Sequence, residues 1–184
     1  MKAITVWQPW ASLIALGAKP YEFRGWPAPR ALIGQRIAIH AGARKVQRAE
    51  VRALVIRLRG SKPWDSALLA DEALPLLDAL LLNPGRAPLS SVVATAVLFE
   101  CRRANDIARE FGAPQNDSAR DEHFNWAWRL ADAQPLEPVA PARGAQGFWD
   151  WRGERSAAGE GVGSTFAAQL CRRFGLDPDE QVKR

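Results

Sequence analysis

The sequence predicts one α+β domain with a helical insertion and a C-terminal helical extension. Three observations support this. Apolar side chains alternate with a period of two in short segments of both halves, which is typical of strands, and recur every three or four residues in the segments between them, which is typical of helices. The 184 residues are 47% hydrophobic, enough for one sizeable core. We find no internal repeat and no second core. We therefore expect a domain over residues 1–152, with the insertion at about 61–90, and a loop plus C-terminal helix over 153–184 that packs on the same domain.

Four short elements are predicted at the start of the chain. They are a strand at 3–6, a helix at 9–16, a strand at 21–24 and a strand at 35–41. Pro9 suits an early helix position because its missing N–H has no helical partner there, and Gly17 suits the end of that helix. Ile37 and Ile39 alternate with smaller residues, so the fourth element is a half-buried strand.

Two longer helices follow. The first is predicted over 43–58, where Val46, Ala49, Ala53 and Ile56 have helical spacing. The second is predicted from a cap at Asp65 to residue 82, with Pro75 kinking or splitting it and Asn83-Pro84-Gly85 ending it.

The second half is predicted to supply the remaining strands. Residues 91–101 are rich in Val, Thr and Phe, and the positions Phe124, Trp126, Trp128 and Leu130 would all face one way on a strand. Trp149 and Trp151 have the same spacing. Proline and glycine in 133–147 predict a break between these strands, and Phe166, Leu170 and Phe174 predict the C-terminal helix. We expect the strands to share one curved sheet or barrel, with Trp126 and Trp128 facing its core and Trp10 partly accessible.

The charge is concentrated in the first third of the chain. The net charge is +5, but the first sixty residues hold eleven Lys or Arg and only two Glu, a balance of +9. Such a bias favours a polyanionic partner, and Arg44 and Lys45 are candidate phosphate contacts. The basic run that starts at Arg44 also fits a helix face that is simply solvated. Two cysteines, no signal peptide and no membrane-spanning stretch lead us to expect a cytoplasmic protein without a membrane contact.

The segment Gly17-Ala18-Lys19-Pro20-Tyr21-Glu22-Phe23-Arg24 carries the clearest chemistry. On a strand, Glu22 and Arg24 share one face, so an acid and a base would project together, with Lys19 in the turn before them. Lys19 and Glu22 are the candidate catalytic pair, and Arg24 would complete a polar binding floor. An ordinary surface ion pair is the alternative.

Trp7-Gln8-Pro9-Trp10 lies where the first strand meets the first helix. Trp10 could stack on a base and Gln8 could hydrogen-bond its edge, since a stacked base contributes about 1–3 kcal/mol. Alternatively, one or both of the rings of Trp7 and Trp10 only fill the apolar core at the end of a sheet. His40 ends the fourth element and could contribute to the same site. Neither His40 nor His123 has the partners of a metal site, so we expect no metal and no cofactor.

Together these residues resemble the ASCH domain, a branch of the PUA-like superfamily. The resemblance rests on the Gln8-Pro9-Trp10 corner, on the spacing of Gly17, Lys19, Glu22 and Arg24, on the strand that ends at His40-Ala41, and on the late segments 126–130 and 144–149. It covers roughly residues 1–152. It implies a small β-barrel flanked by helices, with a basic, Trp-lined cleft that binds RNA, single-stranded nucleic acid or a modified nucleobase.

Members of the family that hydrolyse N4-acetylcytidine suggest a second function, and others are associated with RNA cleavage. In such a hydrolase or ribonuclease Lys19 would activate water or a nucleophile and Glu22 would accept the proton. This chain departs from the amidohydrolases because Pro20 follows Lys19 and Glu22 stands where a threonine is expected. A third interpretation is a protein adaptor that docks through the Leu-rich insertion at 65–82. We expect a monomer in each case.

Overall fold

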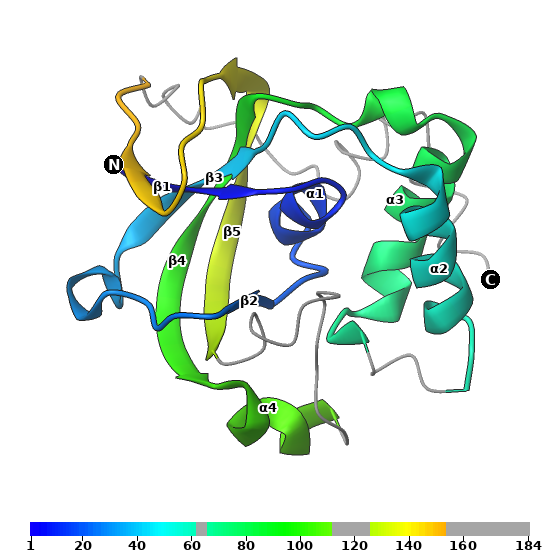
Figure 1. The fold of residues 1–184 in the computed structure, drawn as a ribbon, viewed down its shortest axis with the longest axis horizontal. Helices are drawn as coiled ribbons and strands as arrows, with labels where there is room; N and C mark the ends of the chain where they lie inside the picture. Colours follow the sequence, from blue (N-terminus) through cyan, green and yellow to red (C-terminus); the bar gives the residue numbers. More distant parts are fainter. Residues whose placement is uncertain (62–65, 112–125, 154–184) are drawn as a thin grey trace, which may run out of the picture.

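The protein is described by a computed structural model, which covers residues 1–61, 66–111 and 126–153. A curled six-stranded sheet with helices along its side forms the fold, so the α+β class is confirmed (Figure 1). The strands are β1 (Lys2–Val6), β2 (Tyr21–Arg24), β3 (Arg36–Ala41), β4 (Ser91–Arg103), β5 (Trp126–Pro141) and β6 (Phe148–Asp150). The α-helices are α1 (Trp10–Ala15), α2 (Arg48–Leu58), α3 (Ala70–Leu82) and α4 (Ala104–Phe111).

All six strands belong to one sheet, as expected, in the order β2-β5-β4-β3-β1-β6. β1 and β3 run parallel, and the other neighbours are antiparallel. The inner face of the curl holds the main apolar core, which α1 covers and in which Trp128 is wholly buried. Trp126 packs against this core, whereas Trp10 keeps part of its ring accessible, so both expectations about the tryptophans are confirmed.

The break predicted over 133–147 is wrong for its first part, because β5 continues to Pro141. β2 pairs with residues 126–129 of β5, and the Leu130 amide donates to the Pro20 carbonyl at 2.8 Å; beyond Leu130 no described strand pairs with this edge of β5. On its other side the register shifts, with Pro135 opposite Ala94 and Ala140 opposite Val92. Proline is tolerated at open edges and in bulges because no ladder N–H is required there.

The helical region differs from the prediction in its details. α2 begins at Arg48 instead of residue 43, and it buries Val51, Leu54, Val55 and Leu58. The expected apolar positions mostly face outward, and Ile56 is 66% exposed. The buried residues of α2 form a continuous apolar row that packs against α3, and this contact decides which face of the helix is buried.

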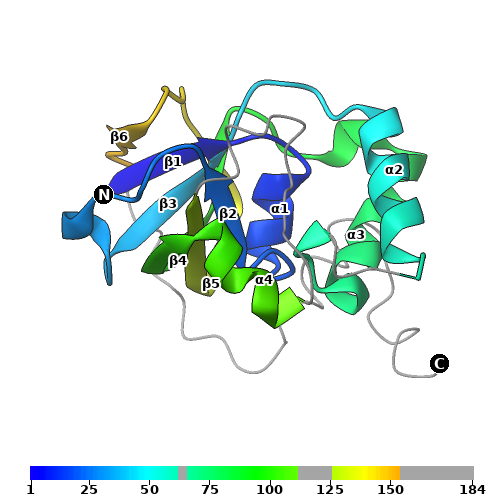
Figure 2. The same cartoon turned by 60° about the horizontal axis from the view of Figure 1, so that its bottom comes forward.

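α3 lies beside α2, and both are separated from the sheet by α1 (Figure 2). Leu76, Leu77 and Leu80 pack with α2 and with Leu13 of α1, so the apolar residues divide into two main clusters that meet at α1, where we expected a single core. The helix continues past Pro75, and Asn83 follows its last residue. Four of the eight leucines at 65–82 are therefore buried, whereas Leu69 and Leu82 are exposed.

α4 is attached to the sheet by a polar network. The Tyr21 hydroxyl donates to Glu110 at 2.7 Å and accepts from Arg102 at 2.7 Å, and burial with the Glu110 contact raises the pKa of Tyr21. Asp65, His123, Phe124 and the predicted C-terminal helix lie outside the described residues. Within the described ranges no helix is long and apolar enough to span a membrane.

Candidate functional site

The candidate site lies where the curled sheet approaches itself. β2 is one end of the strand order and β1 is next to the other end, yet Arg24 of β2 reaches β1 and donates through Nη2 to the Thr5 carbonyl at 3.0 Å. We call this junction between β2 and β1 the seam. Among the described strands β6 pairs with β1 only as far as Ile4, and the Thr5 carbonyl beyond it accepts from a side chain.

Lys19 enters the seam from the turn after α1. Gly17 makes this turn with φ of +77°, a conformation that glycine adopts without strain. The Lys19 ammonium donates to the Tyr21 carbonyl at 2.6 Å and lies 3.4 Å from Glu22 Oε2. It also lies over the rings of Trp10 and Phe23, at 5.3 and 5.2 Å from their centroids.

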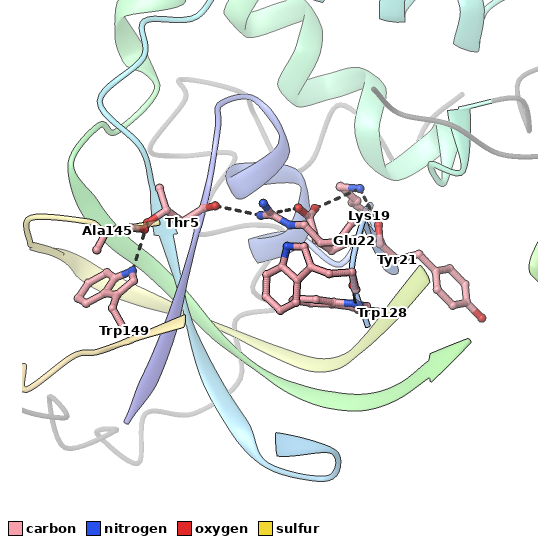
Figure 3. Close-up of polar contacts among 9 residues, drawn as sticks. Thr5, Lys19, Tyr21, Glu22, Trp128, Ala145 and Trp149 are labelled. Carbon is pink, nitrogen blue, oxygen red and sulfur yellow. Dashed lines mark hydrogen bonds and ion pairs between the residues drawn. The ribbon is translucent and has the colours of Figure 1, made fainter. Parts of the chain in front are cut away.

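Glu22 links the two cations. Its Oε1 contacts Arg24 Nη2 at 2.8 Å while its Oε2 faces Lys19, so a chain of charges runs from Lys19 to Arg24 (Figure 3). The Lys19 side chain is 1% exposed and that of Glu22 is 8% exposed. Buried charges must be paired to offset the loss of hydration, and here each has its partner.

Arg24 is the part of the chain of charges that meets solvent. A quarter of its side chain is exposed, and its Nε is buried without a hydrogen-bond partner among the described residues. Only the exposed part of the side chain can donate to an acceptor such as a base carbonyl or a phosphate, because Nε is buried.

Trp26 belongs to this site and was missed in the sequence. It follows Glu22 and Arg24 at the same spacing of two, and this alternation is the signal that could have found it. Its partly exposed ring packs edge-on against Trp128 with centroids 4.7 Å apart, and its carbonyl accepts from Trp128 Nε1 at 3.3 Å. Trp128 in turn stacks on Phe148, with an angle of 7° between the rings.

Trp10 and Gln8 differ in how much they offer a ligand. Trp10 begins α1 beside Lys19 and is partly exposed. Gln8 is buried; its amide nitrogen donates to the Pro88 carbonyl at 2.9 Å and its oxygen accepts from the Ser12 amide at 3.1 Å. The Gln8 side chain thus holds the corner between β1 and α1.

The structure does not bring His40 to the seam. Ile39 and Ala41 face the inner core, so His40 lies on the outer face of β3 with Trp149 and Thr5. The Thr5 hydroxyl accepts from Trp149 and donates to the Ala145 carbonyl, on the other side of β1 from Glu22 (Figure 3). His40 Nε2 donates to the Ala142 carbonyl, Nδ1 has no partner in the part of the chain that is described, and burial lowers the pKa of His40.

Arg44 and Lys45 lie in the segment after β3. Arg44 pairs with Glu50 and stacks over the ring of Trp7, at 4.6 Å from its centroid. Lys45 is exposed. Among the described residues, neither makes a hydrogen bond or ion pair with Lys19, Glu22 or Arg24.

Comparison with known proteins identifies the family of the chain. The family model of the ASCH domain matches residues 4–140. The chain belongs to the ASCH domain family. The crystal structure of ASCH from Zymomonas mobilis is 19% identical, with a TM-score of 0.42, and the alignment covers 76% of this chain and 72% of that one. A point mutant of the same protein gives the same values, and a second gives 20% identity and a TM-score of 0.38 over 73% and 70% of the two chains. No curated protein is matched by the sequence.

In this ASCH domain the Gly-x-Lys-x-x-Glu-x-Arg segment has a clear structural meaning. The glycine makes the turn, and the three charged side chains satisfy one another and two strand-edge carbonyls. Within the described ranges, no three His, Cys, Asp or Glu side chains are close enough together to hold a metal ion.

Proposed function

We propose that this ASCH domain binds RNA or another single-stranded nucleic acid and holds one base, ordinary or modified, at the seam. The observation that carries the proposal is the fixed position of Glu22 between Lys19 and Arg24, next to tryptophans that are only partly buried. A carboxylate accepts from the amino group of cytosine, and an arginine donates to a base carbonyl, so this arrangement can read a base edge.

The charge of the chain supports a polyanionic ligand. The first sixty residues carry a balance of +9, and Lys45, which is exposed, follows Arg44 in the chain. Cations around a base site would hold the phosphates of the strand without reading sequence.

A binding titration tests the proposal. Fluorescently labelled single-stranded RNA and DNA oligonucleotides should bind with an affinity that falls with salt by about −0.7 in the log–log slope for each phosphate contact. Glu22→Gln should change which base is preferred, and Trp10→Ala should weaken binding without changing the slope. Lys45→Ala should weaken all sequences alike and lower the slope. Arg59→Gln, an exposed substitution directly after α2, is the control. Binding that ignores salt, or no binding to any strand, would refute the proposal.

One observation favours a second candidate, hydrolysis of an acylated nucleoside or of RNA. Lys19 Nζ and Glu22 Oε2 lie 3.4 Å apart in a largely dry setting, which suits a pair that moves a proton. In amide hydrolysis Lys19 would orient the water and Glu22 would take its proton as the oxygen bonds to the acetyl carbon. Glu22 would then return this proton to the leaving nitrogen as the C–N bond breaks, which releases acetate and cytidine. Release of acetate from N4-acetylcytidine that stops in Glu22→Gln, with the variant still folded, would establish this activity. If the folded protein binds the nucleoside but does not hydrolyse it, the hydrolase function is refuted and only the binding function remains.

A further inference from the structure

We infer that Trp7 and Arg44 form a second base position, a stacking platform for a neighbouring base of the strand held at the seam. The inference rests on the proposed nucleic-acid binding and adds a place for a second nucleotide, so that an oligonucleotide would bind more tightly than a single nucleotide.

Trp7 is an exposed ring held in a fixed position. It directly follows β1 and is 52% exposed. The Arg44 guanidinium covers part of the ring at 4.6 Å from its centroid, and Glu50 holds that guanidinium through Nη1 at 3.2 Å and Nη2 at 2.5 Å. Gly42 lies against the ring edge, since a Cβ there would be 3.2 Å from Trp7 Cδ1.

A ring fixed in this way costs little further entropy when a base stacks on it. Base–aromatic stacking is tolerant of sequence, and an arginine on the ring adds a favourable cation–π contact. By contrast, Trp128 is wholly buried and fills the core, so it offers no surface to a ligand. Trp7 leaves half of its surface to solvent.

The surroundings favour a nucleic acid strand as the occupant. Lys45 is exposed next to Arg44, and both belong to the strongly basic first third of the chain. Trp7 is two residues after Thr5, whose carbonyl holds Arg24 at the seam. Two residues span at most roughly 7 Å of backbone. A Cβ at Gly42 would meet both Trp7 and the Thr5 side chain, so the ring lies on the Thr5 side-chain face of β1, and an oligonucleotide held at the seam would reach it around the end of β1.

The test compares probes of different length. The probes are a nucleoside monophosphate, a labelled single-stranded octanucleotide, and an octanucleotide of the same length with abasic positions. Trp7→Ala should weaken the octanucleotide roughly 5- to 150-fold, the loss expected for one stacked base. The same substitution should leave the monophosphate and the abasic strand unchanged. Trp7→Phe should retain most of the affinity.

The chain offers a matched control. Phe99 is also 52% exposed and lies under an arginine, with Arg129 at 5.1 Å from its ring centroid, but it is on β4, away from β1. Phe99→Ala should not change binding of any probe. Arg44→Lys keeps the charge but loses the flat guanidinium, so it should weaken the octanucleotide and not the abasic strand.

The outcomes separate the two proposals. If the octanucleotide binds and Trp7→Ala has no effect, the platform is wrong and the base site at the seam stands. An equal loss for the monophosphate would assign Trp7 to the first base position, and an equal loss for the abasic strand would make it a backbone contact; either result overturns the inference. If no probe binds the unchanged protein, the proposed function itself fails.

Discussion

Arg24 holds the carbonyl of Thr5 at 3.0 Å, and this contact joins two strands that are four places apart in the sheet order. The same Arg24 nitrogen contacts Glu22, which also faces Lys19. Closure of the curled sheet and organisation of the candidate site therefore depend on the same side chains. A substitution in this chain of charges should affect both stability and ligand binding, and the two effects must be measured separately.

The pair of Lys19 and Glu22 gives the first stability prediction. Lys19→Met keeps the length of the side chain but leaves Glu22 buried with Arg24 as its remaining cation, so the free energy of unfolding should fall by about 3–5 kcal/mol. Urea denaturation measures the change. Arg59→Gln removes the exposed pair with Asp78 and should cost at most about 1 kcal/mol. Equal effects of the two substitutions would show that the pair at the seam behaves like a surface pair.

Gly144 gives a prediction about close packing. A Cβ at this position would lie 2.4 Å from His40 Cε1 and 2.7 Å from Thr5 Oγ1, which forces the backbone or both side chains to move. Gly144→Ala should therefore destabilise the protein by about 1–3 kcal/mol. Gly42→Ala, where the nearest atom would be at 3.2 Å, should cost less. Thermal unfolding of the two variants makes the comparison, and the reverse order would contradict this packing.

His40 gives a prediction about pH. Burial lowers its pKa, so the folded protein holds fewer protons than the unfolded chain just below pH 6.5. The stability that His40 contributes is therefore complete above about pH 6.5 and is lost as the pH falls toward and through the folded pKa. His40→Gln can keep the donor to Ala142 but cannot titrate. Between pH 7.5 and 5, the free energy of unfolding of the His40→Gln variant should fall less than that of the unchanged protein. If the two free energies fall in parallel with pH, protonation of His40 does not destabilise the fold.

The two kinds of tryptophan give a fourth prediction. Trp128 is wholly buried, stacks on Phe148 and donates to Trp26, so Trp128→Ala should cost about 3–5 kcal/mol of stability. Trp7→Ala removes an exposed ring and should cost less than half of that. Denaturant titrations of both variants decide the point. A larger loss for Trp7 would mean that its ring supports the fold and is not reserved for a ligand.

Much of the sheet could be predicted because its signals are local. The strands at β1, β2 and β3 follow from alternation over four to six residues, and the structure places them within one or two residues of the expected bounds. The buried face of α2 was not predicted. Both candidate apolar rows have helical spacing, and contact with α3, which is far away in the sequence, decides between them.

The same reasoning separates the parts of the candidate site. Lys19, Glu22 and Arg24 were placed together correctly because they lie within six residues on one turn and one strand. His40 was grouped with them only because it ends a strand, although its alternation with Ile39 already indicates the opposite face. The contact of Arg24 with Thr5 depends on how far the sheet curls, which no local pattern shows.

The pairing of β1 with β6 has a consequence for the order in which the protein can fold during synthesis. Ile4 pairs with Phe148 and Lys2 with Asp150, so β1 pairs with a strand that is synthesised much later, 148 residues further along the chain in the case of Lys2 and Asp150. Until then, one edge of β1 has backbone groups without strand partners, and such edges invite pairing with other chains. A nascent chain that stalls before residue 148 would lack β6, so this edge of β1 would remain available for pairing with other chains.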